Sequence, residues 1–89
     1  MSNRIYKYPL KPTGTQNVNM PDGARILCVQ MQGVAITLWA LVDADSNSTT
    51  DRIIRIVGTG NTFQDSNLCD YIGTVLDDGM VYHVWERTR

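Results

Sequence analysis

Hydrophobic and polar positions alternate along much of the chain with the period of a β-strand. Residues 25–32 place Leu27, Val29 and Met31 on one side, the pattern of a strand with one fully buried face. Residues 52–57, RIIRIV, alternate in the same way and put one arginine on each face. This period of two residues predicts a β protein.

One segment is apolar on both faces. Residues 34–42 read VAITLWALV and are rich in β-branched side chains, which indicates the central strand of a sheet or a strand covered on both sides. Within it we expect Trp39 to be a core residue, because aromatic side chains dominate the packing of small domains. Further short strands are predicted over residues 4–10, 16–20, 71–76 and 80–86.

Turn-forming residues separate these segments. The Pro-Asp-Gly sequence of residues 21–23 suits a tight reversal that closes a hairpin, and the Asp-Asp-Gly sequence of residues 77–79 predicts a terminal hairpin. Residues 11–14 form a further turn, and the small polar residues 43–51, DADSNSTTD, predict an exposed, mobile loop. Residues 62–70 lack alternation and contain capping residue types, so a short helix and a long loop are both open there.

These elements predict a single, mainly β domain over residues 1–89. About six short strands joined by tight turns are typical of a small antiparallel sheet rolled into a sandwich or half-barrel, with one short helix across its open face if residues 62–70 are helical. A chain of 89 residues buries only a small core, so we also expect a homo-oligomer to add stability.

Composition and charge narrow the range of partners. The formal net charge of −1 supplies no basic field for tracking a long nucleic acid, although a local group of arginines or lysines could hold a small phosphate ligand. The N-terminal residues, MSNRIYKYPL, carry charges within the first seven positions and have no apolar run long enough for a signal peptide or a membrane span, which predicts a cytoplasmic protein without membrane contact. Cys28 and Cys69 are far apart and lack a C-x-x-C partner, so we expect reduced thiols, no metal site and no cofactor.

The chemistry-bearing residues favour binding over catalysis. His83 is the only histidine, and it shares a strand face with Val81 and Trp85. A general base needs a nucleophile or an orienting carboxylate beside it, and the sequence contains no recognisable catalytic motif. A structural or ligand-binding role is therefore favoured for His83, and we expect the protein not to be an enzyme.

The glycine-rich segment 58–62, GTGNT, has two alternative roles. Its backbone N–H groups could form an anion site that holds phosphate, with Arg55 as the charged partner. It lacks the lysine and the spacing of a P-loop, and its glycines serve equally well in a strand-ending turn, which is the favoured role. Aromatic side chains, with Trp85 as the best placed, offer flat surfaces on which a base could stack.

Short motifs along the chain resemble a family of small proteins of uncharacterised domain type that is common in phages and prophages. The matching pieces are IYKYPL at residues 5–10, MPDGARIL from Met20, LWALVD at 38–43, RIIRIVGTG at 52–60, YIGT at 71–74 and HVWE at 83–86. They span nearly the whole chain and are specific in combination. The last motif more usually has phenylalanine where Trp85 stands, so a large aromatic residue occupies the position in both cases.

Some small phage proteins of this kind act as sponges that bind the cyclic nucleotide signals of bacterial defence, including the cyclic dinucleotides, such as cGAMP, of the CBASS pathway. The resemblance therefore implies a phage-encoded homo-oligomer in the cytoplasm of the infected host that sequesters a cyclic nucleotide without cleaving it and so counteracts anti-phage defence. The residues assigned to ligand binding in that role are Tyr8, Arg55, Thr59, His83 and Trp85, with Arg4 and Lys7 as reserve cations.

Two rival functions stay open at this level. A protein-interaction module would inhibit a host or phage protein through an exposed strand edge or through the terminal hairpin. A nucleotide-degrading enzyme would use His83 as its base and would turn its ligand over.

Overall fold

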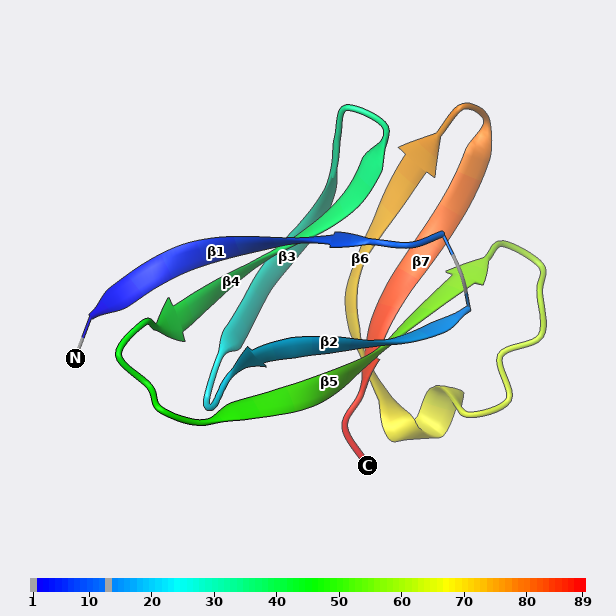
Figure 1. The fold of residues 1–89 in the computed structure, drawn as a ribbon. Coiled ribbons are helices and arrows are strands. Elements are labelled where there is room, and N and C mark those ends of the chain that lie inside the picture. Colours follow the sequence, from blue (N-terminus) through cyan, green and yellow to red (C-terminus); the bar gives the residue numbers. More distant parts are fainter. Residues whose placement is uncertain (1, 13) are drawn as a thin grey trace.

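The computed structural model describes residues 2–12 and 14–89, and strands make up most of it. The strands are β1 (Asn3–Leu10), β2 (Thr15–Pro21), β3 (Arg25–Gln32), β4 (Ala35–Asp43), β5 (Thr49–Gly58), β6 (Cys69–Asp77) and β7 (Met80–Arg87) (Figure 1). A single short 3-10 helix, η1 (Ser66–Leu68), precedes β6. The prediction of a mainly β fold is confirmed, with seven strands in the described residues where about six were expected.

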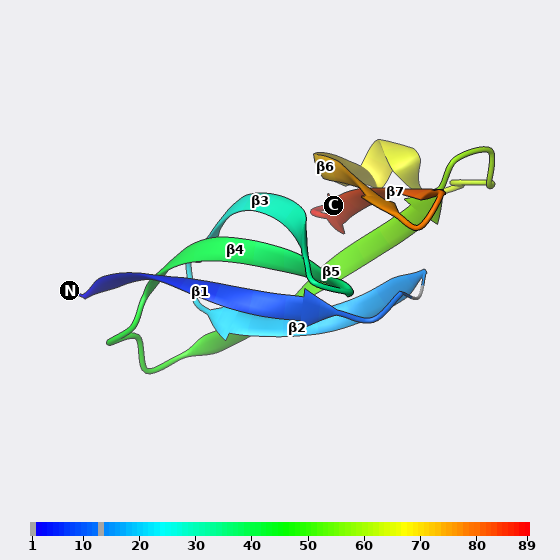
Figure 2. The same cartoon turned by 90° about the horizontal axis from the view of Figure 1, so that it is seen from above.

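The strands form two antiparallel sheets that face each other. The three-stranded sheet has the order β1-β4-β3, and the four-stranded sheet has the order β2-β5-β7-β6. The edge strands β1 and β2, one from each sheet, lie on the same side of the molecule. Figure 2 shows the two layers from above. The edge strands β3 and β6 contact each other at the opposite side. This half-open arrangement confirms the predicted antiparallel sandwich or half-barrel.

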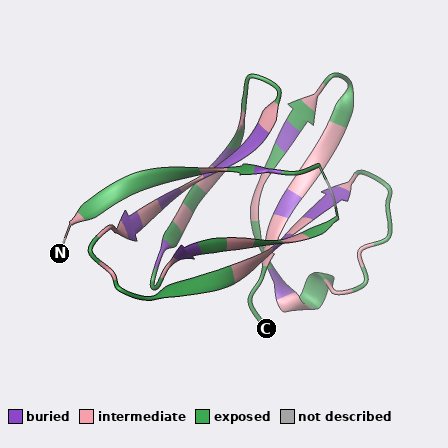
Figure 3. Cartoon of the chain, viewed as in Figure 1, coloured by how far each residue is buried: buried purple, intermediate pink, exposed green. Residues whose placement is uncertain are grey.

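The core lies between the inner faces of the two sheets, where Figure 3 shows buried positions along β4, β5 and β7. The even-numbered residues of β4 from Ile36 to Val42 are buried, and they pack against apolar residues from the facing sheet. The buried apolar cluster contains Leu10, Met20, Ala24, Val29, Ile36, Leu38, Ala40, Val42, Ile54, Ile56, Val75 and Val84. Burial of this apolar area is the main force holding the sheets together.

The prediction of Trp39 as a core residue is wrong. β4 is the central strand of its sheet, as predicted, but its inward residues are the even-numbered ones that flank Trp39. Trp39 is half-buried on the outer face, opposite Lys7 of β1 and Cys28 of β3. Since neighbouring side chains of a strand point to opposite faces, only one of the two apolar faces of this strand can meet the other sheet.

Two β-bulges break the regular alternation near the contact between β3 and β6. Leu27 is the extra residue in β3, and Ile72 is the extra residue in β6. The predicted buried face of β3 is therefore only partly right: Val29 is buried, but Leu27 is 41% exposed, and Ile26 packs against the core instead. A bulge inserts one residue without a partner and so exchanges the faces on its two sides.

The Pro-Asp-Gly segment turns the chain, but the hairpin predicted there does not form. The Ala24 N–H donates to the Pro21 carbonyl (3.1 Å), and Gly23 has the positive φ of 77° that this turn needs. β2 and β3 nevertheless belong to different sheets, so the turn carries the chain between layers. Turn residues fix a local reversal, whereas pairing depends on which strands offer a complementary face.

The terminal hairpin is confirmed. β6 pairs with β7 in antiparallel register, and the two residues between them, Asp78 and Gly79, have φ angles of 49° and 83°. Positive φ at both positions is the requirement of the tightest hairpin turns, and Asp-Gly is a preferred pair for it.

The predicted loops are shorter than expected. Residues 49–51 of the polar segment belong to β5 and pair with β2, where Asn19 Nδ2 donates to the Asp51 carboxylate (2.8 Å). In the segment 62–70, residues 62–65 are loop, residues 66–68 form the 3-10 turn η1, and residues 69 and 70 belong to β6. Of the turn predicted over residues 11–14, Thr13 lies outside the described residues.

Candidate functional site

The outer face of the four-stranded sheet brings four of the five predicted binding residues together. In the strand register Arg55 of β5 lies opposite Trp85 of β7, and the next pair along the same face is Val57 and His83. The fourth residue, Thr59, comes from the loop that follows β5 and reaches the His83 ring. We call this surface the outer face of the β5-β7-β6 sheet.

His83 is held at both of its ring nitrogens. Its Nε2 is 2.8 Å from Thr59 Oγ1, and its Nδ1 is 3.0 Å from Thr74 Oγ1. The Thr74 hydroxyl is also 2.5 Å from the Tyr71 hydroxyl. Four side chains therefore form one chain of polar contacts across β6 and β7, in which each hydroxyl both donates and accepts as the histidine tautomer requires.

The β-bulge in β6 makes this network possible. Residues 71 and 74 have opposite parity, so a regular strand would point their side chains to opposite faces. The extra residue Ile72 shifts the register between Tyr71 and Gly73, which returns Thr74 to the same face as Tyr71. Bulges often re-aim side chains near functional sites.

An aromatic cluster stands beside the network. The ring of Trp85 makes edge-on contacts with Tyr71 and with Phe63, at centroid distances of 5.1 and 5.2 Å. The guanidinium of Arg55 lies 5.5 Å from the centre of the Phe63 ring, a distance at which the cation is attracted to the ring. Phe63 belongs to the segment between β5 and η1, so these contacts hold that segment against the sheet.

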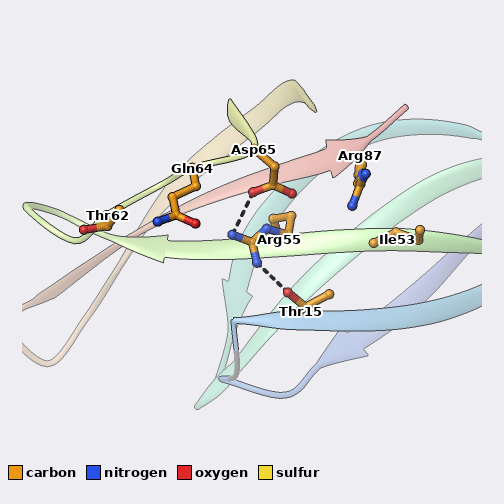
Figure 4. A pocket seen from close by; sticks show the side chains of 7 residues that line it. All are labelled: Thr15, Ile53, Arg55, Thr62, Gln64, Asp65 and Arg87. Atoms are coloured by element: carbon orange, nitrogen blue, oxygen red, sulfur yellow. Dashed lines mark hydrogen bonds and ion pairs between the residues drawn. The ribbon is translucent and has the colours of Figure 1, made fainter. Parts of the chain in front are cut away.

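Arg55 occupies the wall of an open pocket of about 430 Å³ (Figure 4). The pocket is lined by Thr15, Ile53, Arg55, Thr62, Gln64, Asp65 and Arg87. One terminal nitrogen of Arg55 pairs with the Asp65 carboxylate (3.0 Å), and the other donates to the Thr15 hydroxyl. Its Nε is buried and has no hydrogen-bond partner among the described residues.

The charge balance of the pocket favours an anion. Two arginines, Arg55 and Arg87, face a single carboxylate, that of Asp65. The Nε of Arg87 donates to the backbone carbonyl of Arg89 (3.3 Å), and its side chain is exposed. Hydroxyl and amide groups from Thr15, Thr62 and Gln64 complete a polar lining suited to phosphate oxygens.

The glycine-rich segment forms a turn rather than an open anion site. The Asn61 N–H donates to the Gly58 carbonyl (3.1 Å), and Gly60 has a φ of 85°, the geometry of a turn that needs glycine at its third position. The Thr59 N–H donates to the carbonyl of Val81 (3.3 Å). Two of the amides that an anion would need are thus already engaged, and Thr59 contributes its side chain instead.

Tyr8 lies apart from the other predicted binding residues. It is on β1 of the three-stranded sheet, opposite Leu38, and packs against the core. Burial, and secondarily the neighbouring Tyr6, raises the pKa of Tyr8. The reserve cations Arg4 and Lys7 are exposed on the same strand, and Lys7 Nζ donates to Gln32 Oε1 (3.0 Å).

Sequence reasoning did not single out Thr74, Phe63, Asp65 and Arg87, which the structure adds to this face. Gly73 is the one local signal that bears on Thr74, because glycine inside a strand often marks a bulge. The period of two residues in β7 is a signal for Arg87, because it puts Arg87 on the face of His83 and Trp85. No comparable signal places Phe63, since its position depends on how a loop folds back over the sheet.

A second hollow lies beside the contact between β3 and β6. It contains the paired side chains of Arg52 and Glu86, and Arg52 Nη1 donates to the Ala24 carbonyl (2.7 Å). The hydrogen bonds that Arg52 donates to the Glu86 carboxylate raise the pKa of Arg52 above its usual range. These groups satisfy one another, so the hollow is a structural junction between the turn after β2 and the four-stranded sheet.

In the described ranges no group of three or more His, Cys, Asp and Glu side chains is placed to hold a metal ion. Cys28 and Cys69 are free thiols, and burial raises the pKa of Cys69. Among residues 2–12 and 14–89, no helix has the length and apolarity to cross a membrane.

The whole chain matches a known protein family. The family described as a domain of unknown function, DUF7352, matches residues 1–89. No curated protein and no solved structure matches the chain. The family description assigns no activity.

Proposed function

We propose a function for this chain, which belongs over residues 1–89 to the DUF7352 family: it binds a cyclic nucleotide, such as a cyclic dinucleotide of the cGAMP type, and withholds it without cleaving it. In this proposal the protein is phage-encoded and acts in the infected host as a sponge for a defence signal. The carrying observation is the anion-favouring pocket of Arg55 and Arg87 next to the ring cluster around Trp85, in which Trp85 is half-buried and Tyr71 is exposed.

The two halves of a nucleotide match the two halves of this surface. The phosphate would lie in the pocket, which Arg55, Arg87 and Asp65 help to line. The Asp65 carboxylate pairs with Arg55, so no carboxylate of the lining neutralises the charge of Arg87. Arginine binds phosphate oxygens through two parallel N–H groups. The base would stack near Trp85 and Tyr71, and Tyr71 is 56% exposed. Base stacking on aromatic rings contributes about 1–3 kcal/mol per base.

The environment of His83 supports retention of the ligand rather than its cleavage. A general base must take a proton from the attacking group. Both ring nitrogens of His83 are within hydrogen-bond distance of threonine hydroxyls, at 2.8 and 3.0 Å. In the proposal this histidine positions Thr59 and Thr74 for ligand contact and does not activate water.

The test is direct binding of a panel of cyclic di- and trinucleotides by native mass spectrometry and calorimetry. The bound ligand is then released by heat denaturation and identified by chromatography. We expect one panel member to bind and to be recovered intact. Recovery of a cleaved product would replace the proposal with the enzyme, and binding of no panel member would replace it with the protein-interaction module.

A pair of variants locates the site. Arg87→Ala removes a charge that lines the pocket, and we expect it to weaken binding by about tenfold or more, since a hydrogen bond to a charged group contributes about 1.5–3 kcal/mol. Arg89→Ala is the matched control, because it removes the same charge from a residue that pairs with Asp70 outside the pocket. Equal losses in the two variants would exclude this pocket as the phosphate site.

A further inference from the structure

The strand β1 is an edge strand that is exposed on both of its faces. It is the outermost strand of the three-stranded sheet, and residues 3–7 are all exposed (Figure 3). Two of these residues are large and apolar: Ile5 is 61% exposed and Tyr6 is 39% exposed. An exposed, apolar edge strand is a template for pairing with another strand.

The register identifies which backbone groups of β1 point away from β4. Asn3 lies opposite Asp43, so Ser2 lies opposite Ala44, and the Ala44 N–H donates to the Ser2 carbonyl (2.8 Å). Hydrogen-bonded and non-bonded pairs alternate in an antiparallel ladder. The even-numbered residues of β1 therefore bond to β4, and the odd-numbered residues direct their N–H and carbonyl groups outward.

These outward groups define a short pairing site. Asn3, Ile5 and Lys7 each offer an outward N–H, whereas Pro9 has none. β1 pairs with β4 without a register shift over its whole length, so the strand has no bulge that would turn its edge away from a partner. Pairing can therefore extend over residues 3–7 and ends at Pro9.

We propose that β1 pairs in antiparallel orientation with β1 of a second copy of this chain, with Ile5 opposite Ile5 on the two-fold axis. In this register Asn3 faces Lys7 of the second copy, and Arg4 faces Tyr6 of the second copy. About six backbone hydrogen bonds form, because each directly opposed hydrogen-bonded pair exchanges two. The three-stranded sheets of the two copies become one continuous sheet.

The sequence of β1 is self-complementary in this register. No positive charge faces another, because Arg4 meets an aromatic ring and Lys7 meets the neutral Asn3. Arginine over a tyrosine ring is attractive, and two β-branched residues facing each other across strands stabilise the pair. The two isoleucines, each largely exposed in one copy, become mutually covered.

The other edges of the sheets fit a partner less well. The edge strand β2 presents Thr15, Asn17 and Asn19 on its outer face, and Asn19 already donates to Thr49 and Asp51. β3 and β6 contact each other. Among the strands of the described residues, β1 thus combines outward backbone groups with exposed apolar side chains.

The first test is the mass in solution of the full chain carrying its tag at the C-terminus, so that β1 stays accessible. We expect light scattering and sedimentation equilibrium to give twice the 10.0 kDa of one chain. Ile5→Lys should raise the dissociation constant by about tenfold or more, because it removes an apolar pair and opposes two lysines. Leu76→Lys is the matched control, since Leu76 is 72% exposed on β6, and it should remain a dimer.

A second pair of variants tests the register and does not depend on apolar contacts. Asn3→Glu places a carboxylate opposite Lys7 of the second copy and should tighten the dimer, whereas Asn3→Lys should weaken it. A wild-type monomer, or a dimer that Ile5→Lys leaves intact, would overturn the proposal. So would equal effects of Asn3→Glu and Asn3→Lys. None of these outcomes depends on whether a nucleotide binds.

Discussion

Gly73 of β6 lies against Val29 of β3, so close that a Cβ at position 73 would be 2.8 Å from Val29 Cγ1. This contact joins an edge strand of one sheet to an edge strand of the other, beside the two bulges. A glycine at this point lets the strands approach to a distance that any side chain would prevent.

Gly73→Ala should therefore destabilise the protein by about 1–3 kcal/mol, because an added methyl group in a packed region forces its neighbours to move. Val29 is buried and β-branched, so it has few ways to yield. Urea unfolding of Gly73→Ala, Val29→Ala and the double variant measures this. We expect the double variant to lose less stability than the sum of the two single variants; additive losses would contradict the contact.

The ion pair between Arg52 and Glu86 should contribute measurably to stability. The two side chains are 21% and 13% exposed, and Arg52 also holds the Ala24 carbonyl of the turn after β2. Glu86→Gln should lower the free energy of unfolding by about 1–2 kcal/mol, less than for a fully buried pair. Asp70→Asn is the control, because Asp70 and Arg89 are largely exposed, and it should change that free energy by about 0.5 kcal/mol or less.

Low pH should reduce the free energy of unfolding, partly through protonation of the Asp43 carboxylate. Its carboxylate accepts the N–H groups of Ser2 (3.2 Å) and Asp45 (3.1 Å), which lower its pKa below the usual 3.8. A carboxyl group with a lowered folded-state pKa stabilises the fold above its unfolded pKa, and the contribution disappears as the pH falls through the folded value. Asp43→Asn should thus show a flatter loss of unfolding free energy below about pH 4; parallel curves for the two proteins would exclude this contribution.

Trp85 should carry the stacking part of ligand binding. Trp85→Ala should weaken the cyclic nucleotide that binds by roughly tenfold to a hundredfold, given the contribution of one stacked base, while Trp85→Phe should retain most of the affinity. Trp39→Phe is the control, since Trp39 lies on the outer face of the other sheet. Calorimetry on the four proteins decides this, and a loss in Trp39→Phe as large as in Trp85→Ala would place the base elsewhere.

Asp65 should reduce the affinity for the nucleotide, whereas Trp85 should increase it. Its carboxylate pairs with Arg55 at 3.0 Å and so competes with a phosphate for the same guanidinium. Asp65→Asn keeps the size of the side chain but removes the charge. The two paired side chains are 20% and 23% exposed, and we expect tighter nucleotide binding by roughly twofold to fivefold, because such a pair contributes about 0.2–1 kcal/mol. Weaker binding in this variant, with unchanged unfolding free energy, would show that phosphate does not approach Arg55.

Much of the fold is encoded in short-range patterns. The alternation in residues 25–32 and 52–57 predicts β3 and β5, because a strand exposes every second side chain to the same environment. The continuous apolar run of residues 34–42 predicts the central strand β4. The Asp-Asp-Gly turn predicts the pairing of β6 with β7 for the same local reason. In both cases the information lies within a few residues.

Short-range sequence patterns do not predict the contacts between segments that are far apart in the chain. The Pro-Asp-Gly turn predicts a reversal but not that β2 and β3 enter different sheets, and the apolar stretch around Trp39 does not tell which face meets the second layer. Both depend on which other strands pack nearby, and that is a property of the whole chain.

Some features of the candidate site follow from local sequence patterns, and others depend on contacts between distant segments. Alternation alone predicts that His83 and Trp85 share a strand face and that Arg52 and Arg55 lie on opposite faces, because side chains two residues apart lie on the same face of a regular strand. Three relationships depend on the packing of the sheets: Arg55 lies opposite Trp85, Thr74 reaches His83 through a bulge, and Tyr8 lies on the other sheet. Register and bulges are set by packing between segments far apart in the chain, so no local pattern contains them.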